Sequence, residues 1–229
     1  MLRNYYKHAK ERELQGIPAL PLNAEETQEL TVLLQKPPIG KENELVYLIS
    51  ERIPPGVDES AYVKATWLSA VANGSIYSPV IEPLKATHLL GTMIGGYNVA
   101  ALLELLENKN ENIANKAAEG LSHTLLVYDS VNDVIELAKN NIFAKKILNS
   151  WANAEWFQSK KSLAESITIT VFKVSGETNT DDLSPATHAT TRPDIPLHAQ
   201  AMLESRVPNG LKIIDELKRK GFPVVYVGD

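Results

Sequence analysis

The feature that most constrains the fold is a series of amphipathic segments, each ended by proline or glycine and joined to the next by a short connection. Within residues 23–157, apolar side chains recur at helical spacing, as at Leu30 and Leu34. Asn23 is followed three residues later by Glu26, which is the capping-box pattern of a helix start. Because short connections force successive helices to lie antiparallel, this region predicts packed helix pairs.

Eight or nine such helices favour an α-solenoid of HEAT type, in which helix pairs stack side by side. No clean repeated motif accompanies them, so a compact irregular helical bundle stays open as the alternative. Trp151 and Trp156 fall on one predicted helix, where we expect core or interdomain packing. The predicted helical segments lie at 2–14, 24–36, 42–53, 58–74, 83–91, 99–107, 112–127, 131–140 and 142–157.

The composition changes at Lys160, Lys161 and Ser162. A β-branched run at 168–174 leads into a polar stretch, then come helical patterns at 197–204 and 211–220, and an apolar run at 223–227 predicts a buried strand. Strand, helix and strand in this order indicate a mixed α/β domain.

The sequence therefore predicts a multidomain chain. We expect an all-α HEAT-like helical domain at residues 1–160, followed at residues 161–229 by part of an α/β domain that is incomplete at its C-terminus.

Composition excludes several kinds of site. The net charge of -5 argues against binding of a phosphate backbone by bulk electrostatics. The chain has no cysteine, which excludes disulfides, thiolate metal sites and cysteine-held iron–sulfur clusters. No apolar run approaches the roughly 20 residues of a membrane helix, and the N-terminus lacks the apolar region of a secretory signal. We therefore expect a cytoplasmic protein with no membrane partner.

Arg192 is the strongest candidate for ligand binding. It lies between Thr191 and Pro193 in the polar stretch that follows the predicted strand. A guanidinium group presents a rigid fork of donors that matches a carboxylate, so this position suits a polycarboxylate ligand. The alternative is an ordinary surface arginine on a loop.

Other polar side chains lie on both sides of this arginine. Asp181 and Asp182 could orient a histidine or arginine of a site, but their spacing favours a helix cap. Ser184 has no base placed near it by the sequence, so we interpret it as a turn former rather than a nucleophile. His188 and His198 could line a site, although a histidine with satisfied hydrogen bonds or full exposure is the alternative for each; none of the five histidines shows metal-ligand spacing.

Several of these stretches resemble the bacterial aconitase B family. The similar segments are VFKVSGETNTDDLSPA at 171–186, TRPDIPLHA at 191–199, KGFPVVYVGD at 220–229, RIPPGVDE at 52–59, LLGTM at 89–93, GGYN at 95–98 and LSHT at 121–124. The resemblance covers nearly the whole chain. It implies a HEAT-like helical domain, then a swivelling β/β/α domain, and then further domains that hold a 4Fe–4S cluster.

The resemblance also implies an activity and roles for residues. The family's reaction is the interconversion of citrate and isocitrate through cis-aconitate in the tricarboxylic acid cycle, with 2-methylisocitrate dehydration as a second activity. Arg192 corresponds to a substrate-binding arginine, and Thr191 stands where the family has a serine. Asp181 and Ser184 become site-lining candidates. The catalytic base and cluster cysteines are expected beyond Asp229, so we expect no catalytic residue, metal ligand or bound cofactor in this chain.

On this basis we expect an N-terminal enzyme fragment that is inactive alone. Its expected partners are the tricarboxylate substrates, the remaining aconitase domains and a second copy bound through the helical domain. The resemblance also implies messenger RNA binding, which the acidic balance does not favour. The alternatives are a protein- or RNA-interaction module built on the helical domain, and a purely structural shield for the catalytic domains.

Overall fold

The computed structural model describes residues 2–228 and is mostly helical. Its contacts divide the chain into two compact units. The helical unit is formed mainly by Pro21–Lys161, and the α/β unit combines Ser162–Asp229 with Asn4–Leu20. The boundary after Lys161 coincides with the change in composition. Residues 4–20, which lie inside the predicted domain 1–160, group with the α/β unit, and Arg12 and Gln15 form hydrogen bonds with side chains of that unit.

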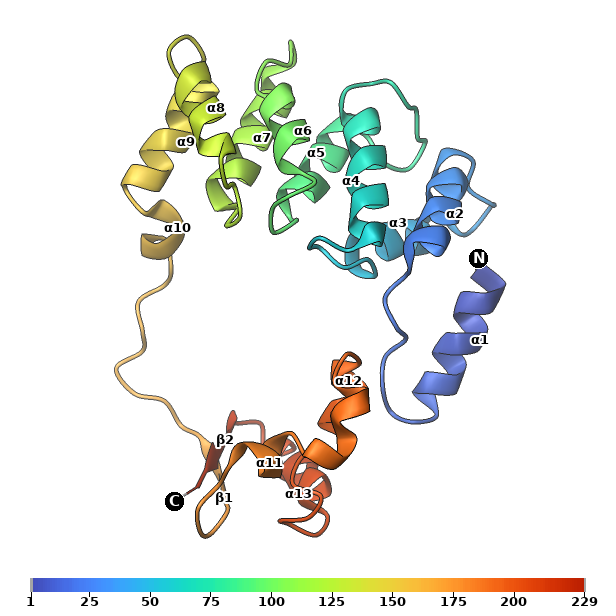
Figure 1. Ribbon diagram of the computed structural model, residues 1–229, viewed down its shortest axis with the longest axis vertical. Helices are drawn as coiled ribbons and strands as arrows, with labels where there is room; N and C mark the ends of the chain where they lie inside the picture. Colours follow the sequence, from blue (N-terminus) through green and yellow to red (C-terminus); the bar gives the residue numbers. More distant parts are fainter. Residues whose placement is uncertain (1, 229) are drawn as a thin grey trace. The chain divides into compact units, whose positions relative to one another are not determined.

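The helices of the helical unit follow one another along an arc (Figure 1). Helix α4 packs against α2 and α5, and α7 packs against α5 and α9, so each helix is covered by its neighbours in turn. Their bounds are α2 Ala24–Gln35, α3 Glu42–Glu51, α4 Glu59–Ala72, α5 Pro83–Gly91, α6 Val99–Leu105, α7 Glu111–His123, α8 Ser130–Leu137, α9 Ile142–Ala152 and α10 Glu155–Gln158.

Asparagine side chains cap the starts of α2, α7 and α9. The predicted capping box is confirmed: the Asn23 side chain accepts from the Glu26 amide at 2.9 Å, and the Glu26 carboxylate accepts from the Asn23 amide at 3.1 Å. The single helix predicted at 142–157 is wrong. Ala154 has a left-handed φ of 49°, which separates α9 from α10 and places Trp151 and Trp156 on different helices.

The core of the helical unit lies between its successive helices. Helices α5 and α7 approach so closely that a Cβ on Gly120 would lie 2.8 Å from the Cα of Gly91. Only glycine fits at both positions of this contact. The fully buried apolar side chains include Leu30, Leu34, Leu45, Leu48, Ile49, Leu68, Ile81, Leu90, Leu102, Leu106, Leu121, Val134 and Ile147.

The α/β unit is built on a pair of parallel strands, with Thr170 of β1 opposite Val224 of β2. A parallel pair needs a long crossover, and here the crossover contains all the other elements of residues 162–228. A small core of Phe172, Val174 and Leu203 lies beneath them. The elements are α1 Leu2–Glu13, β1 Thr170–Lys173, α11 Thr180–Leu183, the 3₁₀ helix η1 Ala186–Thr191, α12 Ile195–Ala199, α13 Gly210–Lys218 and β2 Val224–Val227. The predicted mixed α/β arrangement is confirmed at this coarse level.

Two details of this unit differ from the predictions. The helix predicted at 197–204 is instead the shorter α12, which the Asp194 side chain caps two residues before the predicted start. Residues 200–204 form turns, and Leu203 among them has a left-handed φ of 62°. Strand β2 alternates between half-buried and exposed residues, so the predicted buried strand is only partly covered.

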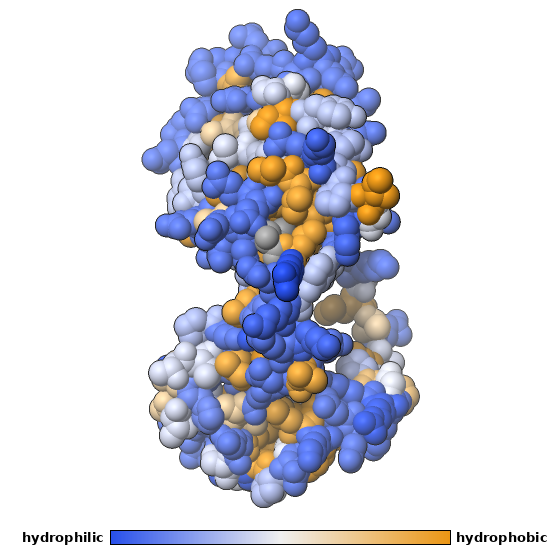
Figure 2. All heavy atoms as spheres, turned by 90° about the vertical axis from the view of Figure 1, so that its right-hand side faces the viewer, coloured by the Kyte–Doolittle hydropathy of each residue, from blue (hydrophilic) through white to orange (hydrophobic). Residues whose placement is uncertain are grey.

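Hydrophobic atoms also reach the surface on the face shown in Figure 2, and Ile195 in this unit is 76% exposed.

No helix within residues 2–228 has both the length and the apolar character that a membrane crossing requires.

Candidate functional site

Arg192 lies in the middle of a turn that connects η1 to α12. The amide of Asp194 donates to the carbonyl of Thr191 at 2.9 Å and closes this turn around Arg192 and Pro193. The Arg192 side chain is exposed, and its one contact in the described part of the chain is a long one, 3.5 Å from Nη2 to the Ser184 carbonyl. No carboxylate of residues 2–228 forms an ion pair with it. The guanidinium charge therefore faces solvent and is open to an anionic ligand.

His198 holds the first end of this turn. Its Nδ1 lies 2.9 Å from the Thr191 hydroxyl, and its Nε2 lies 2.8 Å from the Ser184 hydroxyl. The Thr191 hydroxyl donates its only proton to the His188 carbonyl at 2.8 Å. Nδ1 must therefore be the donor to Thr191, and in the neutral ring Nε2 accepts from Ser184. One imidazole thus joins the end of α11 to the residue before Arg192.

The fold places a base near Ser184 that the position of Ser184 in the sequence did not indicate. His198 lies 14 positions further along the sequence, and the turn that contains Arg192 brings it back to Ser184. The other ring nitrogen of His198 contacts a hydroxyl rather than the carboxylate that orients the base in a hydrolytic triad. We therefore interpret this pair as a support for the turn. His188 is also satisfied, with Nε2 at 2.7 Å from the Glu204 carboxylate.

The two aspartates take different positions. Asn179 and Asp182 form a capping box at the start of α11, in which the Asp182 carboxylate accepts from the Asn179 amide at 3.1 Å. The cap interpretation therefore holds for Asp182. The Asp181 side chain is exposed, and no hydrogen bond to its carboxylate occurs within the described residues.

The second end of the turn is held by Arg12 of α1. Its Nη1 and Nη2 donate to the two carboxylate oxygens of Asp194 at 2.5 and 2.8 Å, and its Nε donates to the Pro18 carbonyl at 2.6 Å. These hydrogen bonds lower the pKa of Asp194 and raise that of Arg12. Arg12 is 7% exposed. Its partner lies 182 positions away in the sequence, and no pattern in the sequence pointed to this pair.

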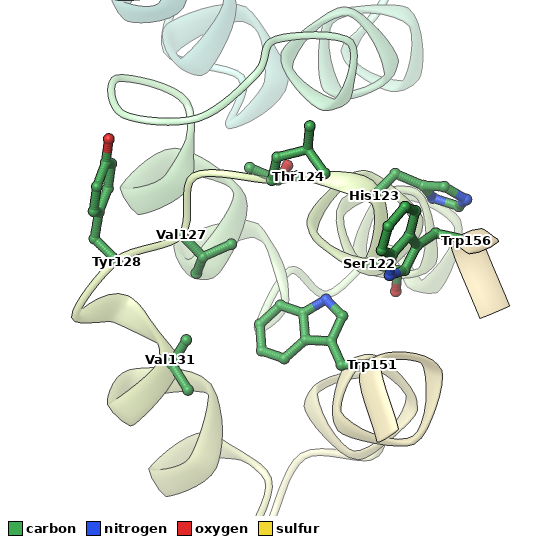
Figure 3. A pocket seen from close by; sticks show the side chains of 9 residues that line it. Ser122, His123, Thr124, Val127, Tyr128, Val131, Trp151 and Trp156 are labelled. Carbon is green, nitrogen blue, oxygen red and sulfur yellow. The ribbon is translucent and has the colours of Figure 1, made fainter. Parts of the chain in front are cut away.

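The helical unit has its own surface hollows. Three of them, of about 360, 290 and 300 Å³, adjoin one another along α4, α5, α7 and α9. The first and second hollows share the lining residue His88, and the second and third share His123. The first contains Lys64 and the last contains Trp151 and Trp156. Figure 3 shows the Trp151 ring extending from α9 toward Val131 and Val127; Trp156 and Ser122 also line this hollow.

None of these groups gathers three or more histidine, aspartate or glutamate side chains in a metal-binding arrangement within residues 2–228.

Comparison with known proteins assigns both units to families. Residues 4–157 match the family described as "Aconitate B N-terminal domain", and residues 169–229 match "Aconitate hydratase 2 N-terminus". The chain is similar over its whole length to proteins named aconitate hydratase B, with 58% identity in Synechocystis sp., 52% in Salmonella typhimurium and 51% in Escherichia coli. It spans 26–28% of the length of these relatives.

Proposed function

Because the chain belongs to the aconitate hydratase B family, we propose that it is the amino-terminal part of an enzyme that interconverts citrate and isocitrate through cis-aconitate. Such a dehydration needs an electrophile at the leaving hydroxyl, a base for the carbon-bound proton and cations for the carboxylates. This chain supplies one of the cations, Arg192. Dehydration of 2-methylisocitrate, a tricarboxylate of similar shape, is proposed as a second activity.

The observation that carries this proposal is the exposed guanidinium of Arg192 on a turn whose two ends are both bonded to other elements. A held turn presents the donor fork in one orientation, which favours two-pronged binding of a carboxylate. Thr191 lies beside it and belongs to the proposed substrate-binding pair. Asp181 and Ser184, on α11 and at its end, are the proposed site-lining residues.

The chain does not fit the 4Fe–4S cluster of the family, because it contains no cysteine. We therefore assign the cluster and the catalytic base to other parts of the full-length enzyme. It follows that the chain alone should not catalyse the reaction.

The test is Arg192→Ala in the full-length enzyme that contains this chain. Loss of a charged hydrogen-bond donor to a carboxylate costs about 1.5–3 kcal/mol, so we expect KM for citrate to rise by about 10- to 100-fold. Arg219→Ala, which removes an exposed arginine at the end of α13, is the matched control. An unchanged KM and turnover in Arg192→Ala would remove Arg192 from the site.

We propose a HEAT-like stack for the helical unit, on the basis of its sequentially packed helices. The adjoining hollows favour a second candidate function, an interaction module that binds a second copy of the chain. Leu125, Tyr128 and Phe157, which lie in or next to the hollow containing Trp151 and Trp156, are 70%, 70% and 62% exposed. Exposed apolar side chains gathered around a hollow are typical of interaction sites.

Sedimentation of the 229-residue chain over a series of concentrations tests this second function. We expect self-association that Trp156→Ala weakens, whereas a monomer at every concentration would argue against it. Gel-shift assays with RNA at rising salt separate the remaining alternative, since nonspecific phosphate contacts disappear at moderate salt.

A further inference from the structure

Arg12 is a buried charged side chain of the α/β unit whose guanidinium is fully engaged in hydrogen bonds, and the proposed activity gives it no role. It is 7% exposed, and each of its three guanidinium nitrogens donates to an acceptor. The free-energy cost of burying this guanidinium is offset because the Asp194 carboxylate carries the opposite charge and accepts two hydrogen bonds from it. The pairing joins two segments that lie 182 positions apart.

Asp194 connects this ion pair to the turn around Arg192. Its amide closes the turn onto the Thr191 carbonyl, and its side chain caps α12 at the Leu197 amide, 3.3 Å away. Asp194 therefore closes the turn, caps the start of α12 and accepts the hydrogen bonds of the Arg12 guanidinium. A second contact between the same segments lies nearby, from the Gln200 side chain to the Gln15 carbonyl at 2.7 Å.

We propose that Arg12 is a positioning residue for the substrate arginine, acting through Asp194. This inference rests on the proposed function of Arg192. His198 fixes the residue before Arg192, and Arg12 fixes the residue two positions after it, so the guanidinium is presented from a turn held at both ends. Without Arg12, the Asp194 end is free to move, and Arg192 samples orientations that do not match the substrate carboxylate.

The test compares Arg12→Gln with Lys10→Gln in the full-length enzyme. Both changes remove a cation from the last turn of α1, so their effects on the helix dipole are matched, but Lys10 is exposed. Because Arg192 is proposed to bind a substrate carboxylate and to take no part in proton transfer, we expect Arg12→Gln to raise KM for citrate by about 10-fold with kcat within about twofold. Lys10→Gln should leave both constants unchanged.

Hydrogen exchange in the 229-residue chain supplies the second readout. The amides of Asp194, Leu197 and His198 should exchange faster in Arg12→Gln than in Lys10→Gln, while those of the helical unit stay unchanged. Faster exchange without a rise in KM, or a rise in KM without faster exchange, would overturn the inference.

Arg12→Lys keeps the inference testable if Arg12→Gln prevents folding of the α/β unit, because lysine retains the charge without the two-pronged fork. We expect it to fold and to give an intermediate KM; a folded Arg12→Lys enzyme with the original KM would overturn the inference. Arg192→Gln separates the two proposals. If it raises KM and the Arg12 variants do not, only the inference fails, whereas an unchanged KM in Arg192→Gln removes both.

Discussion

The two compact units of this chain differ in how completely each covers its own core. In the helical unit, each helix from α2 to α9 has at least one buried apolar side chain, and those of Leu30, Leu68 and Leu102 are fully buried. Among the described residues of the α/β unit, the buried cluster consists of Phe172, Val174 and Leu203, and a two-stranded sheet forms its base. Two strands are marginally stable in water unless further strands or helices cover them. The helical unit therefore stabilises itself, whereas the α/β unit depends on a few individual contacts.

Removing the central side chain of the small core should give the largest difference in stability between the two units. Phe172 is 6% exposed and packs edge-to-face on Tyr226 at 6.0 Å. Phe172→Ala should cost the α/β unit about 3–5 kcal/mol and unfold it. All three tryptophans lie in the helical unit, so their fluorescence transition in urea should stay the same while the NMR signals of residues 170–227 collapse. Phe157→Ala, at a 62% exposed position, is the control.

Removal of a buried charge should have the opposite effect and raise the free energy of unfolding of the helical unit. Lys64 is 1% exposed, and burial lowers its pKa to about 8. Between pH 8 and the unfolded value near 10.5, the unfolded chain binds more protons, so the stability of the helical unit should rise with pH. Lys64→Met should add up to about 3 kcal/mol at pH 7 and flatten this rise.

Urea titrations of Lys64→Met at pH 7 and pH 9.5, followed by tryptophan fluorescence, measure this effect. Lys85→Met, at an exposed position on α5, should reproduce the original pH dependence. An equal dependence in the Lys64 and Lys85 variants would show that Lys64 is hydrated in solution.

The close contact of α5 with α7 predicts that a Gly→Ala substitution there lowers the free energy of unfolding instead of raising it. Gly→Ala inside a helix normally stabilises by about 1 kcal/mol. At Gly120 the new methyl group would lie 2.8 Å from the Gly91 backbone, so Gly120→Ala should instead destabilise the helical unit by about 2 kcal/mol. Gly56→Ala, whose methyl group would meet Ile94 at an ordinary 3.5 Å, should be nearly neutral in the same thermal-unfolding assay. A stabilised Gly120→Ala would show that the two helices separate easily.

The smallest expected effect concerns the support of the turn around Arg192. Thr191→Val removes the hydroxyl that links His198 to the His188 carbonyl, which should cost the α/β unit about 1 kcal/mol. Thr191→Ser keeps the hydroxyl and should stay close to the original stability. Hydrogen exchange at the Asp194 amide, which closes the turn, measures the difference directly. Equal exchange in the two variants would mean that His198 does not hold the turn.

The sequence predicted the helical unit better than the α/β unit, for a physical reason. Helix starts such as Asn23 with Glu26 depend on neighbours three residues apart, which a sequence shows directly. The contacts of the α/β unit are nonlocal: Ser184 with His198, and Arg12 with Asp194. The break at Ala154 also escaped prediction, since alanine normally favours a continued helix and only the surrounding packing sets its φ.

Arg192 was proposed as a candidate ligand-binding residue from the polar loop after a strand and from the resemblance to a family, whereas the contacts that hold its turn were not predicted. Cap residues such as Asp182 could be anticipated because asparagine and aspartate spacing shows them. The second role of Asp194, as the partner of Arg12, required the fold that brings α1 to α12. Its neighbourhood in sequence contains no lysine or arginine other than Arg192.

The most direct test of the account is calorimetric titration of the full-length enzyme with propane-1,2,3-tricarboxylate, which has the three carboxylates of citrate but no hydroxyl to eliminate. Arg192→Gln should raise the Kd by about 30-fold, equivalent to about 2 kcal/mol, while Arg219→Gln should leave it unchanged. Equal Kd values in the original enzyme and Arg192→Gln would contradict the assignment of this guanidinium to a substrate carboxylate.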